Sequence, residues 1–144
     1  MARERLIFDC HPQLSVNHAC VEELVDYTVV DTALTQLGAV SVPLQTSAPL
    51  SQLRPIVAET EPSVIASSID FVDDAVELAL SGPTPERLVV FDFHPEVDDH
   101  REALEATRTQ LRGTGVIVET LADALARGRG LTPPKSVVAE GDDP

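Results

Sequence analysis

The stretch Leu37–Pro62, LGAVSVPLQTSAPLSQLRPIVAETEP, decides the fold that we predict for this chain of 144 residues. Gly38 follows the last apolar residue of a helical pattern and supplies the left-handed cap that a residue with a Cβ resists. The β-forming residues of Val40–Leu44 make a short run, which the turn-prone residues Thr46–Pro49 end. A short strand between two helices is typical of a parallel α/β sheet. We therefore predict an α/β fold in which a parallel sheet alternates with helices.

The same alternation continues along the rest of the chain. The predicted strands are Val40–Leu44, Ser63–Ser67, Arg87–Phe93 and Val116–Val118. The predicted helices cover about 25–37, 51–60, 72–80, 98–112 and 121–127. Thr120 and Asp123 have the spacing of a capping box at the start of the last helix. Pro55 lies inside the second helix, where a proline beyond the first turn costs roughly 3 kcal/mol.

Composition and charge limit the classes of partner. Hydrophobic residues make up 43% of the chain, which is enough for a core. The net charge of −14 opposes phosphate backbones and anionic lipids, so we expect neither a nucleic acid nor a membrane surface as partner. No apolar run approaches the roughly 20 residues that span a bilayer, and no secretory signal is visible. We expect a cytoplasmic protein.

The first residues differ from the rest of the chain. Residues 1–24 show no convincing periodicity, so we expect a peripheral and poorly ordered segment there. Their thiols and imidazoles, Cys10, His11, His18 and Cys20, are ligand types that zinc prefers. Their spacing contains no zinc knuckle, and we assign no metal site to them. A regular domain is expected over residues 25–128, followed by a loose tail over residues 129–144.

One cluster of polar side chains follows the predicted strand Arg87–Phe93. Its members are Asp92, His94, Glu96, Asp98, Asp99 and His100. Carboxylates with imidazoles could bind a divalent metal or exchange protons, and α/β folds place ligands beyond the carboxyl ends of strands. The alternative is a solvated loop that leads into a charged helix capped by Asp98 or Asp99. We favour the loop.

Neither the serines nor the glycines form a recognisable catalytic motif. The hydroxyls of Ser47, Ser51, Ser67, Ser68 and Ser81 lie outside any nucleophile elbow. The sequence also lacks the glycine-rich patterns that hold nucleotide phosphates in Rossmann and P-loop proteins. We therefore assign no catalytic, cofactor-binding or metal-binding residue.

Several segments nevertheless resemble one family. The opening stretch, with its LGAVSVPL, QTSAP and LRPIVAETEP segments, and the later VVFDFH are similar to the adenylation domain of bacterial carboxylic acid reductases. These belong to the adenylate-forming enzymes, which activate carboxylic acids with ATP. The resemblance covers about Val25–Pro144 and implies a partial N-terminal subdomain, a fragment of one AMP-binding domain.

The resemblance also implies what the fragment does not do. In the family, ATP and Mg²⁺ bind to a phosphate loop and later motifs, and the full-length reductase adds NADPH and phosphopantetheine. None of these motifs is present, so we expect no cofactor here and no activity of this chain alone. The carboxylic acid substrate belongs only to the full-length relative.

Three alternatives remain at this point. One is a small interaction module whose exposed sheet edges favour self-association. A second is part of a fatty-acid–CoA ligase, and a third is a small hydrolase or metal enzyme that uses His94 and His100.

Overall fold

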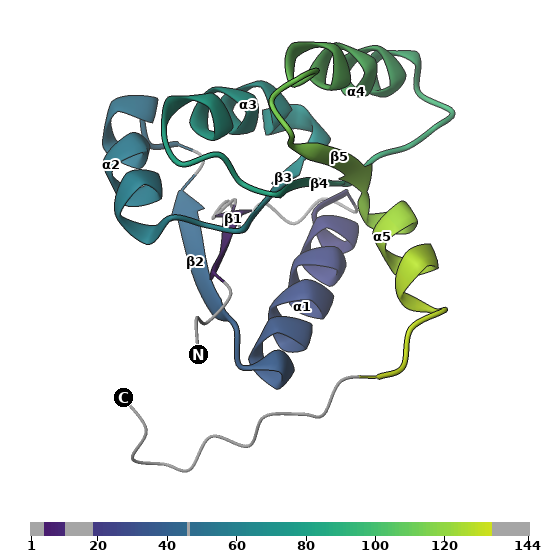
Figure 1. Cartoon of the computed structure of the whole chain (residues 1–144). Helices are drawn as coiled ribbons and strands as arrows, with labels where there is room; N and C mark the ends of the chain where they lie inside the picture. Colours follow the sequence, from purple (N-terminus) through teal and green to yellow (C-terminus); the bar gives the residue numbers. More distant parts are fainter. Residues whose placement is uncertain (1–4, 11–18, 46, 134–144) are drawn as a thin grey trace, which may run out of the picture.

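The computed structural model describes residues 5–10, 19–45 and 47–133, and its strands form one parallel sheet in the order β2-β1-β3-β4-β5 (Figure 1). The strands are β1 (Arg5–Cys10), β2 (Val40–Gln45), β3 (Val64–Ser68), β4 (Arg87–Phe91) and β5 (Ile117–Thr120). The helices are α1 (Ala19–Leu37), α2 (Leu50–Thr60), the short 3₁₀ helix η1 (Ile69–Phe71), α3 (Val72–Ser81), α4 (Asp98–Gln110) and α5 (Leu121–Gly128). The predicted α/β fold with a parallel sheet is confirmed.

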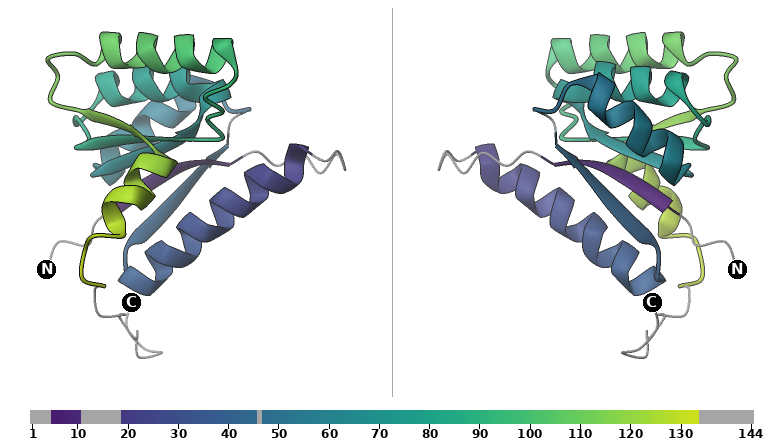
Figure 2. Two further views of the ribbon diagram at one scale, coloured as in Figure 1. Left: turned by 90° about the vertical axis from the view of Figure 1, so that its right-hand side faces the viewer. Right: turned by 90° about the vertical axis from the view of Figure 1, so that its left-hand side faces the viewer.

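The helices cover the two faces of this sheet unequally. Helices α2, α3 and α4 lie on one face, and α1 and α5 lie on the other (Figures 1 and 2). The side chains of β4 alternate between these faces, with Leu88 and Val90 on the first face and Val89 and Phe91 on the second. Both faces of the strand therefore meet helices, as its consecutive apolar residues predicted.

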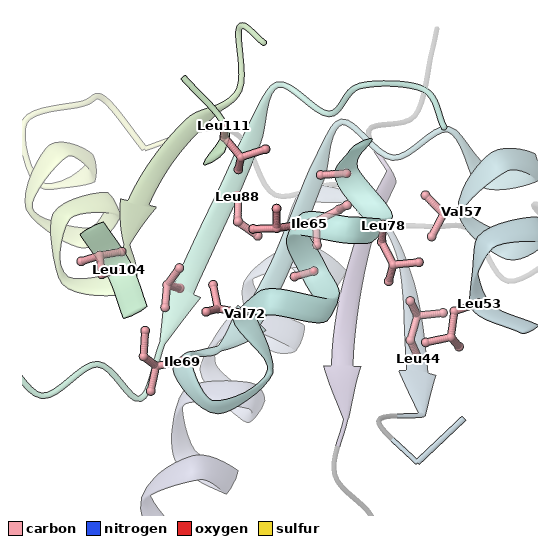
Figure 3. Packing of buried hydrophobic residues seen from close by; sticks show 14 residues of the cluster. Leu44, Leu53, Val57, Ile65, Ile69, Val72, Leu78, Leu88, Leu104 and Leu111 are labelled. Carbon is pink, nitrogen blue, oxygen red and sulfur yellow. The ribbon is translucent and has the colours of Figure 1, made fainter. Parts of the chain in front are cut away.

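The main core lies between the sheet and helices α2, α3 and α4. Figure 3 shows its close-packed aliphatic side chains. The buried members are Leu44, Leu53, Val57, Ile65, Ile69, Val72, Ala75, Val76, Leu78, Ala79, Leu88, Val90, Leu104 and Leu111. On the opposite face only Ala66 and Phe91 form a buried cluster among the described residues, with Val30, Leu34 and Leu121 partly buried against it. The second layer is thus much thinner than the first.

Local signals set the ends of several elements. Gly38 follows α1 with φ +66°, the left-handed conformation that its position predicted. The predicted capping box is confirmed, because the Thr120 hydroxyl accepts from the Asp123 backbone N–H at 3.1 Å and the Asp123 carboxylate accepts from the Thr120 N–H at 3.3 Å. Helix α2 continues through Pro55. Asp98 and Asp99 lie in the first turn of α4 and do not cap it, since Val97 occupies the N-cap.

The structure corrects the position predicted for the N-terminal segment. Residues 1–24 were expected to be peripheral, but β1 pairs in parallel with β2 on one side and with β3 on the other. Its register places Leu6 opposite both Ser41 and Val64. A short inner strand needs no amphipathic period, because ladder hydrogen bonds on both sides hold its backbone. The segment's poor order stays a prediction.

Several further boundaries differ from the predicted ones. The third predicted strand ends at Phe91 rather than Phe93, because Asp92 adopts φ +54° and leaves the extended conformation. The last strand is Ile117–Thr120 rather than Val116–Val118. Helix α1 begins at Ala19, well before position 25. Of the predicted tail over residues 129–144, the part from 134 onward lies outside the described residues.

Candidate functional site

The carboxyl ends of the strands meet at one edge of the sheet, where α/β folds place their ligands. Strand β3 ends at Ser68, β4 leads into Asp92, and β5 ends at Thr120. The chain order reverses between β1 and β3, since β2 lies on one side of β1 and all later strands lie on the other. A ligand site is therefore expected at this edge.

A cavity of about 450 Å³ opens at this edge, between α1, the end of β4 and the start of α5. It is lined by Asp26, Val90, Phe91, Asp92, Phe93, His94, Thr120, Leu121, Ala122 and Leu125. Two carboxylates and one imidazole thus stand among apolar side chains. The acidic groups favour a cationic or neutral occupant over an anionic one.

The predicted Asp92–His100 cluster is divided by the structure. Asp92 and His94 line the cavity, whereas Glu96, Asp98 and Asp99 are exposed on the loop and the first turn of α4. The His100 Nδ1 accepts a hydrogen bond from the His94 backbone N–H at 3.1 Å, and the two imidazole rings lie 5.7 Å apart. These contacts fold the loop onto the start of α4.

The rest of the cluster is occupied by local contacts. Arg101 forms an ion pair with Asp98 and donates to the Pro95 carbonyl at 2.7 Å. The His94 Nδ1 lies 3.5 Å from a Glu96 carboxylate oxygen. Across the described ranges, no three His, Cys, Asp or Glu side chains come together in an arrangement that could hold a metal ion. The geometry is that of a solvated loop joined to a helix.

Three of the serines singled out in the sequence, Ser47, Ser67 and Ser81, make local contacts. Ser67 is fully buried and donates to the Ser68 carbonyl at 3.1 Å, and Ser81 donates to the Leu78 carbonyl at 3.1 Å. Ser47 accepts from the Gln45 side chain at 2.8 Å. Within the part of the chain that the structure describes, no serine hydroxyl bonds to His94 or His100. The described serines therefore form no hydrolase triad with these histidines.

The structure does not test the zinc ligands considered in the N-terminal segment. His11 and His18 lie outside the described residues, as do the side chains of Cys10 and Cys20. Their assignment to no metal site stays a prediction.

One buried ionic group escaped the sequence analysis. Glu119 on β5 is only 8% exposed, and its carboxylate accepts from Arg87 at 3.2 Å and from Arg127 at 2.9 and 3.4 Å. It joins β4, β5 and α5 on the thinner side of the sheet. Side chains alternate between the two faces of the sheet along β5, so Glu119 faces the side opposite to Val118. This alternation is the sequence signal that could have revealed a carboxylate pointing toward the interior of the protein.

None of the described helices is both long enough and apolar enough to cross a membrane.

Comparison with known proteins places the chain beside large reductases, although no family model matches it. It is 59% identical over 119 residues to the carboxylic acid reductase of Mycobacterium tuberculosis, covering 83% of this chain and 10% of that protein. It is 60% identical over 104 residues to the carboxylic acid reductase of Mycobacterium marinum, covering 72% of this chain and 9% of that protein.

Solved structures agree in fold over nearly the whole chain. The A domain of carboxylic acid reductase from Segniliparus rugosus, in complex with AMP and a co-purified carboxylic acid, superposes with a TM-score of 0.79 at 38% identity. The match covers 99% of this chain and 21% of that one. The adenylation domain of the Mycobacterium chelonae carboxylate reductase gives a TM-score of 0.77 at 36% identity, covering 94% of this chain and 20% of that one. The chain therefore spans about a tenth of the curated relatives and about a fifth of their adenylation domain.

Proposed function

Because this chain belongs to the carboxylic acid reductases, as part of their adenylation domain, we propose that it is a scaffold segment for ATP-dependent activation of carboxylic acids. The observation that carries this proposal is the 59% identity over 119 residues, together with the superposition of 99% of the chain on an AMP-bound adenylation domain. Its role is to supply a parallel sheet on which the rest of such a domain is built. Its compartment is the cytoplasm.

The chain on its own does not perform this activation. Forming an acyl adenylate brings a carboxylate and a phosphate together, and both are anions that need cationic groups and aimed backbone N–H groups. Of the arginines whose side chains are described, five are already paired with carboxylates. These are Arg54, Arg87, Arg101, Arg108 and Arg127. The one lysine, Lys135, follows two prolines in the sequence.

The described residues also do not fit the nucleotide that the family uses. The cavity at the carboxyl edge presents Asp26 and Asp92, and both oppose a triphosphate. In the first turn of α5, the Asp123 N–H already donates to the Thr120 hydroxyl. ATP and Mg²⁺ therefore bind to other parts of the adenylation domain, and NADPH and phosphopantetheine to other domains of a reductase.

A chimera tests the scaffold role directly. In the Mycobacterium tuberculosis carboxylic acid reductase, the matched stretch is replaced by the corresponding residues of this chain. We expect the purified chimera to release pyrophosphate in an acid-dependent reaction within about tenfold of the parent rate, a loss of less than about 1.4 kcal/mol in activation free energy. A folded chimera that binds AMP but activates no acid would contradict the proposal. Circular dichroism and AMP binding separate that outcome from simple misfolding.

A second candidate is a non-catalytic interaction module on the same scaffold. The specific observation in its favour is that β2 and β5 each have one unpaired edge in the described sheet. Pro43 lies within β2 and removes one backbone donor from that strand, which leaves β5 as the better edge for self-association. Sedimentation equilibrium distinguishes the candidates, because this module forms a stable oligomer at micromolar concentration and its chimera is inactive.

A further inference from the structure

The loop between β4 and α4, residues 92–97, is attached to the start of α4 by the side chain of His100. The His94 backbone N–H donates to the His100 Nδ1 at 3.1 Å. The His100 ring also lies beside two rings of the loop, with its centroid 5.7 Å from that of His94 and 6.4 Å from that of Phe93. His100 is half-buried and lies one turn before the buried Leu104, so it belongs to the inner side of α4.

The acceptor in this hydrogen bond is one that titrates. An imidazole nitrogen accepts a hydrogen bond only while it carries no proton, and both ring nitrogens are donors in the imidazolium. The His100 contact therefore requires a neutral ring with its proton on Nε2. Protonation at Nδ1 would leave two donors facing each other. Histidine is also the side chain that changes its charge between about pH 5 and 8.

Other contacts of the loop use groups that do not titrate in this range. The Arg101 guanidinium donates to the Pro95 carbonyl at 2.7 Å, and the Val97 N–H donates to the His94 carbonyl at 3.0 Å. A guanidinium keeps its charge at these pH values, and a carbonyl oxygen stays an acceptor. These two bonds hold the later part of the loop beside α4, whereas the His100 bond holds its start.

The charged groups around His100 are mostly carboxylates. Helices η1 and α3 pack against α4, and they contribute the exposed side chains Asp70, Asp73 and Asp74. The loop and the first turn of α4 contribute Asp92, His94, Glu96, Asp98, Asp99 and Arg101. Carboxylates are strong acceptors for an imidazolium. A protonated His100 that has lost the backbone contact therefore has other acceptors within its own surroundings.

We propose that His100 is a pH-sensitive latch, which holds the start of the β4–α4 loop on α4 while its imidazole is neutral and releases it when the imidazole is protonated. The proton comes from solvent and binds at Nδ1, in place of the hydrogen bond from the His94 N–H. The latch is closed at high pH and opens as the pH falls through the titration of His100. Phe93 and His94 line the carboxyl-edge cavity, so opening the latch frees one wall of this cavity.

Amide hydrogen exchange followed by NMR tests the latch in the 144-residue chain. The measured quantity is the protection factor of the residue 94 amide, relative to an unfolded peptide at the same pH. It should fall by about tenfold between about pH 7.5 and 5.5, as expected for the loss of one hydrogen bond. The Ala48 and Thr114 amides are controls, because they donate to the backbone carbonyls of Gln45 and Leu111 at 2.9 and 3.2 Å. Their protection should not change.

Two variants separate the two imidazoles. His100→Asn places an amide oxygen close to the position of Nδ1, and this oxygen accepts at every pH. The residue 94 amide should then be equally protected at both pH values. His94→Gln removes the other imidazole, whose side chain is 48% exposed, and keeps the backbone N–H. This variant should retain the tenfold response of the parent chain, about the effect of one hydrogen bond.

The parent chain also gives a test that needs no variant. The chemical shift of the residue 94 amide should titrate with the same midpoint as the His100 ring resonances. Different midpoints would overturn the proposal, as would unchanged protection of this amide at the lower pH. A pH response that persists in a folded His100→Asn variant, or that disappears in His94→Gln, would assign the effect to another group and likewise overturn it.

Discussion

The buried carboxylate of Glu119 should stabilise the thinner side of the sheet, and Glu119→Gln tests this at nearly constant side-chain volume. The Glu119 side chain is 11% exposed, while those of its partners Arg87 and Arg127 are 30% and 50% exposed. The two ion pairs should therefore contribute different amounts to the free energy of unfolding. An ion pair with a half-exposed arginine contributes little, whereas one that excludes most water contributes more.

The expected loss follows from these exposures. The Arg127 pair should contribute about 0.5 kcal/mol, in the range of exposed ion pairs. The Arg87 hydrogen bond, at 3.2 Å and less exposed, should contribute about 1 kcal/mol. Glu119→Gln should thus lower the free energy of unfolding by about 1.5 kcal/mol, and Arg127→Gln alone by about 0.5 kcal/mol. The corresponding melting temperatures should fall by about 5 °C and about 2 °C.

Urea titration followed by circular dichroism measures both variants and their double mutant. We expect the urea slope to stay constant and the double mutant to resemble Glu119→Gln, because the Arg127 contact is already lost there. Additive effects, or a Glu119→Gln variant as stable as the parent, would refute the role assigned to this network.

Three further substitutions test the local and core interactions. Thr120→Ala removes the hydroxyl that accepts from the Asp123 backbone N–H and donates to the Asp123 carboxylate, and it should cost about 1 kcal/mol, with faster amide exchange in α5 and near-parent behaviour of Thr120→Ser. Pro55→Ala restores a backbone donor inside α2 and should raise the free energy of unfolding by about 1–2 kcal/mol. Alanine stabilises the helix by more than the unfolded chain gains in conformational entropy when the proline is removed. An unchanged urea midpoint would contradict this expectation. Leu104→Ala opens a cavity beneath α4 and should cost about 3 kcal/mol, whereas a loss below about 1 kcal/mol would mean that α4 packs loosely.

The repeated helix–strand units were visible in the sequence because their apolar periods are local. Val40–Leu44 and the consecutive apolar residues of β4 need only neighbouring positions to be recognised. Strand β1 is different, since its place between β2 and β3 depends on pairing with residues about 35 and 58 positions away. Its six residues, RLIFDC, contain a charge at each end of a short apolar run, which locally resembles a loop.

The candidate site shows the same limit. The polar residues after β4 could be recognised from their position beyond a strand, but their division between the cavity and the exposed loop depends on Asp92 leaving the strand at positive φ. Asp26 and Leu125 join Asp92 at the cavity only because α1 and α5 cover the same face. The spacing of residues along the sequence cannot predict that side chains from α1, α5 and the end of β4 meet at one cavity.

The isolated chain provides the most direct test of the central claim, that it is a scaffold segment without acid-activating chemistry of its own. Mg²⁺–ATP is titrated calorimetrically into the purified 144-residue chain, and pyrophosphate release is followed with a panel of aromatic and fatty acids. We expect no binding heat and no acid-dependent release above a protein-free blank, because five of the described arginines are paired with carboxylates and the cavity is acidic. Binding of ATP at roughly micromolar concentration, or acid-dependent pyrophosphate release by this chain alone, would contradict the claim.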